Sequence, residues 1–145
     1  ELGKSVDHPD HGRRVLLLPC PGEQHTFGLV MVAEFFRMAS WDVTGGAWAA
    51  DTDAAALVES EWFDVVGFSL GAAVHLSALT DSVRRVRSAT CNRDLIILVG
   101  GPLFGVHPEF VAQVGADGMS IDGHEAPVLA ESLIAANTSH HQSRG

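Results

Sequence analysis

The sequence has few positive charges, few cysteines and no long apolar run. It holds 9 Lys and Arg against 18 Asp and Glu, which gives a net charge of −9. Because a nucleic-acid surface needs clustered cations to neutralise phosphates, direct nucleic-acid binding is not expected. The one basic cluster, RRVR at 84–87, has the spacing of a solvated helix face.

The lack of long apolar runs and the low cysteine content indicate where the protein is located. No apolar run reaches the roughly 18 residues that span a bilayer, so no membrane partner is expected. The first dozen residues are polar and lack the apolar segment of a signal peptide. Cys20 and Cys91 have no metal-ligand spacing, and a chain of 145 residues needs no disulfide framework, so a reducing cytoplasm is expected. The chain begins with Glu, which indicates a fragment or a processed chain.

Apolar runs of strand length alternate with helical patterns along one predicted domain, residues 13–137, between a flexible lead (1–12) and a disordered tail (138–145). Strands are predicted at 13–19, 41–47, 64–70, 94–101 and 116–123. Helices are predicted at 28–40, 51–61, 73–89, 107–115 and 125–137, the second capped by Asp51 or Thr52.

Unbroken apolar strands alternating with helices predict a parallel sheet that is covered on both faces. With right-handed crossovers, this is a doubly wound, Rossmann- or flavodoxin-like α/β fold with strand order 2-1-3-4-5. Ligands of such sheets bind beyond the carboxyl ends of the strands. The segments expected there are CPGEQHTFG, FSLGAA, VGGPLFG and IDGHE.

Several protein classes that share this fold have loop motifs that these segments lack or match only in part. A receiver domain needs an aspartate where the third strand ends in Ser69, and a dinucleotide-binding fold needs a G-x-G-x-x-G that is absent. The segment GFSLG (67–71) matches the G-x-S-x-G elbow of hydrolases, but His124 is the only late histidine that could complete a triad.

Three short motifs together resemble the cobalamin-binding domain family. Glu23-x-His25-x-x-Gly28 stands where that family has D-x-H-x-x-G. Ser69-Leu70-Gly71 stands where it has S-x-L, and Gly100-Gly101 matches its G-G. The three motifs occur in the family's order and after the same strands, and the resemblance covers residues 13–137.

The resemblance implies base-off cobalamin, with the lower benzimidazole and its nucleotide tail in a slot beside the sheet. His25 is then the lower axial ligand of the metal, and Glu23, one methylene longer than the family's aspartate, is its hydrogen-bond partner. Ser69 is expected to bond the buried benzimidazole, while Gly100 and Gly101 let the tail pass close to the backbone. The full set of expected cofactor-binding residues is Glu23, Gln24, His25, Thr26, Phe27, Gly28, Ser69, Leu70, Gly71, Gly100, Gly101, Pro102 and Gly123.

The segment PCPGEQHTFGLVMVAEFF, with Glu in place of Asp, resembles a subgroup found in regulators of photosynthesis genes in purple bacteria. These antirepressors respond to light and oxygen, so the resemblance implies a sensory domain whose protein partner is a transcriptional repressor. Some members are described as binding haem, for which His25 is again the axial ligand.

The sequence is also compatible with other functions and other residue roles. The chain could be the corrinoid carrier of a methyltransferase or mutase, acting with a partner chain, or an interaction module without cofactor. Ser69 could simply cap the third helix, and Gly100-Gly101 could be only a tight turn.

Overall fold

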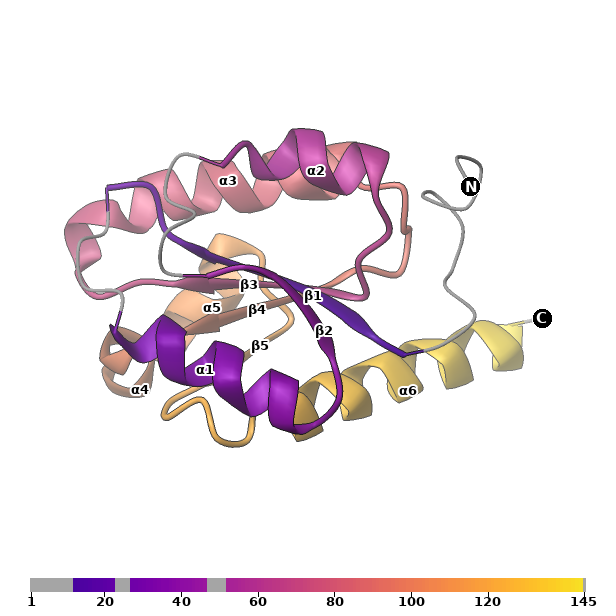
Figure 1. Cartoon of the computed structure of the whole chain (residues 1–145). Helices are drawn as coiled ribbons and strands as arrows, with labels where there is room; N and C mark the ends of the chain where they lie inside the picture. The colour runs from indigo at the N-terminus through magenta and orange to yellow at the C-terminus, as the bar shows by residue number, and fades with distance from the viewer. Residues whose placement is uncertain (1–11, 23–26, 47–51, 145) are drawn as a thin grey trace.

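The chain folds as an open parallel sheet with helices on both faces in the computed structural model, which describes residues 12–22, 27–46 and 52–144 (Figure 1). The strands are β1 (Arg14–Pro19), β2 (Asp42–Gly45), β3 (Val65–Ser69), β4 (Ile96–Gly100) and β5 (Gly118–Ser120). The helices are α1 (Phe27–Met38), α2 (Ala54–Ser60), η2 (Ala73–His75), α3 (Leu76–Ala89), α4 (Pro102–Val106), α5 (Glu109–Val114) and α6 (Ala126–Arg144).

The strand order is β2-β1-β3-β4-β5, and every pair is parallel. This confirms the predicted doubly wound topology. Strand side chains alternate between the two faces. In β1, Leu16 and Leu18 point into a core formed with α2, α3 and α5, whereas Val15 and Leu17 point into a second core formed with α1 and α6 (Figure 1).

The carboxyl edge of the sheet is the end at which β1, β3, β4 and β5 deliver their loops, and α4 lies there. The long α6 runs from this edge toward the amino-terminal end of the strands (Figure 1). Among the described residues, none of the helices combines the length and the apolar character that a membrane crossing requires.

Three details differ from the predicted elements. The cap of α2 is Asp53, whose carboxylate accepts the Ala56 N–H at 3.2 Å, so Thr52 is not the cap and Asp51 lies outside the described residues. Helix α4 was not predicted, because five residues are too few for a periodic pattern. Helix α6 continues to Arg144 instead of ending in a disordered tail at 138, since no Gly or Pro interrupts residues 128–144.

Candidate functional site

The strand register places four residues in one row along the carboxyl edge of the sheet. Pro19 pairs with Ser69, Ser69 with Gly100, and Gly100 with Ser120. Because paired residues of neighbouring strands point to the same face, the side of Ser69, Gly100 and Ser120 is also the side of Leu98 and of the core under α1 and α6. Two of the predicted loop motifs therefore meet at one place.

A narrow apolar cavity, called the slot below, lies between this face of the sheet and the two helices. Its volume is about 40 Å³. Its walls come from β1, β3 and β4 on one side, from α1 and α6 on the other, and from Ser120 at the end of β5. The lining residues are Leu17, Leu29, Val32, Phe36, Val65, Gly67, Phe68, Ser69, Leu98, Val99, Gly100, Ser120 and Ala126.

Two glycines leave the space that forms the slot. A Cβ on Gly67 would lie 2.8 Å from Leu17 Cδ2, and one on Gly100 would lie 3.2 Å from the Ser120 carbonyl oxygen. Any side chain at either position would therefore press on the slot wall. Gly67 was not among the predicted site residues, although a glycine inside an apolar strand is a signal of close approach by a ligand or backbone.

Among the described residues, the Ser69 hydroxyl is the polar group of this slot that has no hydrogen-bond partner. Its Oγ is buried and has no hydrogen bond to the described part of the protein. Buried hydroxyls are nearly always hydrogen-bonded, so an orphan one calls for a ligand or a water. The alternative helix-cap role is wrong, because α3 begins at Leu76 behind η2, whose cap is Ala72.

The hydrolase alternative needs a histidine on this serine, and no described histidine bonds it. His124 instead packs its ring edge-on against Phe35, at 5.1 Å between centroids. The literal G-x-S-x-G match at 67–71 is therefore a strand end with a buried hydroxyl rather than a nucleophile held by a base.

Ser120 differs from Ser69 because its hydroxyl is occupied. Its Oγ accepts the Gly123 backbone N–H at 3.0 Å, which closes the turn between β5 and α6. Gly123 has φ +80°, and a Cβ there would lie 2.5 Å from Val32 Cγ2 on α1. The turn and α1 are thus packed in direct contact beside the slot.

Gly101 also requires its glycine. Its φ is +128°, and a Cβ would collide with the Leu70 carbonyl oxygen. The Leu70 N–H in turn donates to the Gly100 carbonyl at 2.9 Å, so the loops after β3 and β4 are held together by their backbones. Gly100-Gly101 is therefore more than a tight turn: it brings two strand ends within contact.

The remaining predicted residues divide between edge, core and undescribed chain. Gly71 and Pro102 are exposed at the edge, and a Cβ on Gly28 would meet open space. Leu70 is buried in the core on the α2–α3 face, away from the slot, and it stands one position earlier than the leucine of S-x-L. Glu23, Gln24, His25 and Thr26 lie outside the described residues, as does the side chain of Phe27.

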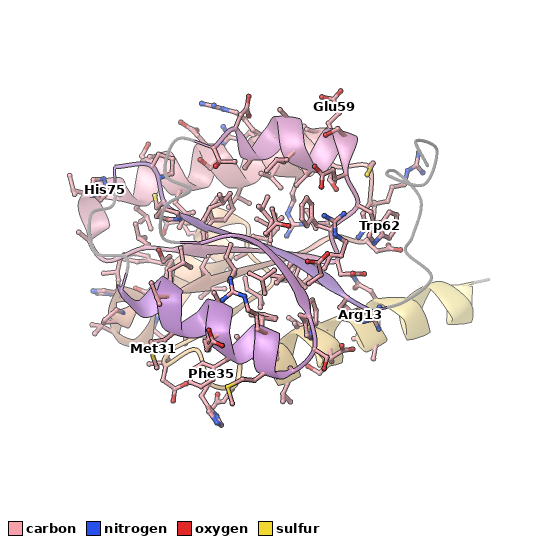
Figure 2. The ribbon with its side chains drawn as sticks, viewed as in Figure 1. Arg13, Met31, Phe35, Glu59, Trp62 and His75 are labelled. Atoms are coloured by element: carbon pink, nitrogen blue, oxygen red, sulfur yellow. The ribbon has the colours of Figure 1, made fainter. Side chains whose placement is uncertain are left out.

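Two other histidines lie at this edge. His75 packs against the loop after β1, since a Cβ on Gly22 would lie 2.9 Å from its Cε1 (Figure 2). His107 Nδ1 lies 3.1 Å from Glu109 Oε2, and its ring stacks on Phe110. The pKa of Glu109 is lowered, chiefly because a backbone N–H donates to its carboxylate and further because His107 is beside it. Among the described side chains, no three His, Cys, Asp or Glu gather closely enough to hold a metal ion.

The fold and the site together define an open α/β domain with a narrow apolar ligand slot at the carboxyl edge of its sheet. The sequence model of the B12 binding domain family matches residues 13–130. The chain therefore belongs to the B12 binding domain family, whose cofactor is cobalamin.

The chain is also similar to individual proteins, one in sequence and others in fold. The chain is 29% identical over 107 residues to an uncharacterized 20.5 kDa protein in the bchF-crtJ intergenic region of Rhodobacter capsulatus, covering 74% of this chain and 55% of that protein. A cobalamin-binding protein from Desulfitobacterium hafniense has a similar structure, with a TM-score of 0.65 at 15% identity over 83% of this chain and 58% of that one. The chain thus spans little more than half the length of these two proteins.

Two further structures have the same fold. The Methanosarcina barkeri monomethylamine corrinoid protein has a TM-score of 0.68 at 15% identity, covering 90% of this chain and 63% of that one. A histidine-kinase receiver domain from Pseudomonas aeruginosa has a TM-score of 0.63 at 15% identity, covering 86% and 99%. At such identities these likenesses describe the fold alone, and Ser69 stands where a receiver needs its aspartate.

Proposed function

We propose that the chain is a sensory domain that binds cobalamin base-off, with the benzimidazole in the slot and His25 as the lower ligand of the metal. The observation that carries the proposal is the buried Ser69 hydroxyl, which has no partner in the described part of the protein. The ring nitrogen of a flat heterocycle could accept a hydrogen bond from the Ser69 hydroxyl, and the apolar walls of the slot would contact the faces of the ring. The chemistry of the slot lining therefore suits the lower base of cobalamin, and the slot would have to widen to admit the ring.

The chain's own groups have separate tasks in this proposal. Gly67 and Gly100 place no side chain in the slot, and the apolar side chains of Leu17, Val32 and Phe36 would exclude water from the ring. Gly100 and Gly101 allow the nucleotide tail to pass along the backbone. His25 would donate its lone pair to the metal while Glu23 accepts its other ring N–H, which sets the tautomer.

The sensory role rests on the motif and on one relative. The motif resembles the subgroup in photosynthesis-gene regulators, and the Rhodobacter relative is named for its position between bchF and crtJ. The corrinoid, when bound, would supply a metal centre that responds to light or oxygen. A repressor that binds one state of the domain more tightly than the other would respond to this change.

The test is an absorption spectrum of the purified chain after incubation with hydroxocobalamin and removal of free cofactor. We expect retained corrinoid with a His-ligated spectrum, and loss of that spectrum in His25→Ala. The matched control is His140→Ala, because residue 140 lies on α6, which runs away from the carboxyl edge (Figure 1). A His25→Ala spectrum identical to wild type would disprove the ligand role.

A corrinoid carrier is the second candidate, favoured by the likeness to the monomethylamine corrinoid protein. The two functions differ in what happens to the loaded domain. A carrier would pass a methyl group to or from a partner chain in the dark, whereas a sensor would change its affinity for a repressor on illumination or oxidation. Haemin in place of hydroxocobalamin in the same spectral test examines the alternative cofactor.

A further inference from the structure

The outer side of α1 carries an apolar stripe that, within the described part of the chain, is largely exposed. Met31, Phe35 and Met38 recur at i, i+4 and i+7, which places them on one face of the helix. Met31 is 42% and Met38 73% exposed, and Phe35 is half-buried. Figure 2 shows Met31 and Phe35 turned away from the sheet. The inner side of the same helix, with Leu29 and Phe36, lines the slot.

The stripe continues onto the turn between β5 and α6. The Phe35 and His124 rings make an edge contact at 5.1 Å with an interplanar angle of 79°. The neighbouring Gly123 is packed against Val32 on α1, which holds the turn in place. The four residues Met31, Phe35, Met38 and His124 form what we call the α1 stripe.

Three exposed carboxylates lie next to members of the α1 stripe in the chain. Glu34 lies beside it on α1, and Asp122 and Glu125 flank His124 in the chain; all three are exposed. The one cation on α1, Arg37, is paired with Glu34 at 3.4 Å, so it does not offset the other two. With the chain's net charge of −9, the surface favours an occupant that is both apolar and basic.

We propose that the α1 stripe is the docking surface for a basic amphipathic helix of a partner protein. Exposed methionines suit this role, because their flexible, polarizable side chains adapt to an apolar helix face. A second copy of this chain would bring the same carboxylates into opposition, and an anionic lipid surface would be repelled. The proposal names the partner surface of the sensory domain, and it does not depend on His25 or on bound cofactor.

The test uses a fluorescent amphipathic peptide about 18 residues, or five turns, long, with leucines at i, i+3 and i+4 spacing and lysines elsewhere. Binding to the whole chain is followed by fluorescence anisotropy. The control peptide has glutamate in place of each lysine. We expect binding of the lysine peptide alone, weakened at high salt, since exposed charge pairs are screened.

Two pairs of variants locate the site. Met38→Gln should weaken peptide binding about tenfold through lost apolar burial, while Val74→Gln, 80% exposed on η2, should leave it unchanged. Glu125→Lys should weaken binding several-fold, while Glu59→Lys on α2 should not. Glu59 lies on the opposite side of the molecule from Met31 and Phe35 (Figure 2).

The outcomes separate this proposal from the cofactor proposal. Met38→Gln should retain cobalamin like wild type, because the residue is on the outer side of α1. Equal binding of the glutamate peptide, or equal losses in the two members of a pair, would overturn the proposed docking site. Concentration-dependent dimerisation in sedimentation that Met38→Gln abolishes would assign the α1 stripe to a second copy instead.

Discussion

Replacing Ser69 with alanine should change stability and cofactor affinity in opposite directions. The Ser69 Oγ is buried without a hydrogen bond to the described protein. An unsatisfied buried hydroxyl costs about 1–3 kcal/mol relative to water. Ser69→Ala removes that cost and leaves a void of a single atom. We therefore expect the free energy of unfolding of the cofactor-free protein to rise by about 1–3 kcal/mol, which is about 2–4 °C in Tm for each kcal/mol at this size.

The same hydroxyl should contribute strongly to the affinity for cobalamin. Because the hydroxyl has no hydrogen-bond partner among the described residues, its bond to a ring nitrogen breaks no hydrogen bond within that part of the protein. A contribution of about 1–3 kcal/mol corresponds to a Kd about 5- to 150-fold higher in Ser69→Ala. Cobalamin titration by absorbance measures this, and urea unfolding of the cofactor-free protein measures the stability.

Ser120→Ala is the matched control. The Ser120 Oγ accepts the Gly123 N–H at 3.0 Å, so its removal leaves a buried donor without a partner. This variant should lose stability where Ser69→Ala gains it. A Ser69→Ala protein that is less stable than wild type, or that binds cobalamin with unchanged Kd, would refute the assignment of this hydroxyl to the ligand.

Three further predictions concern residues away from the slot. Gly101→Ala should destabilise the fold by about 2 kcal/mol or more, because φ +128° is strained for alanine and its Cβ would collide with Leu70; urea unfolding checks this. Asp53→Ala removes the cap on the Ala56 N–H and should cost about 1 kcal/mol in the same assay, while a cost near zero would contradict the capping role. Burial raises the pKa of the Cys91 thiol, so the folded protein holds the thiol proton more tightly than the unfolded chain does. The resulting contribution to stability is present below the pKa of the thiol in the unfolded chain, and it is lost as the pH rises through the pKa of the thiol in the folded protein. Alkylation of Cys91 by iodoacetamide should accordingly reach half its maximal rate at a higher pH than alkylation of glutathione, and an equal or lower midpoint would contradict the shift.

The sheet could be predicted from the sequence because two independent signals, the apolar strands and the helices between them, indicate the same fold. Strands buried on both faces must be apolar throughout, as in DVVGFSL at 64–70, and helices must alternate with them for the connections to be right-handed. The same logic predicted that Ser69 and Gly100 would reach one edge. The register confirms their pairing.

The parts that escaped prediction depend on contacts between distant residues. Gly67 on β3 and Ser120 on β5 both line the slot only because β4 lies between their strands, and nothing local in the sequence marks them as a pair. Asp51, Thr52 and Asp53 are all good caps by type, and the choice of Asp53 depends on where α2 packs. The roles of Glu23 and His25 stay predictions.

The slot has a consequence for the timing of cofactor exchange. A cavity of about 40 Å³ has room for little more than water, and a bicyclic ring needs several times that space. If the benzimidazole binds in the slot as proposed, the slot must widen before the ring can enter, so the rate of uptake would reach a ceiling that more cofactor does not raise. Release of the ring would require the same widening, against the packing of Phe36 and Ala126. In the proposed sensory role, this slow exchange would keep one cofactor bound through many cycles of signalling, so the state of the domain would depend on the metal rather than on the concentration of free cobalamin.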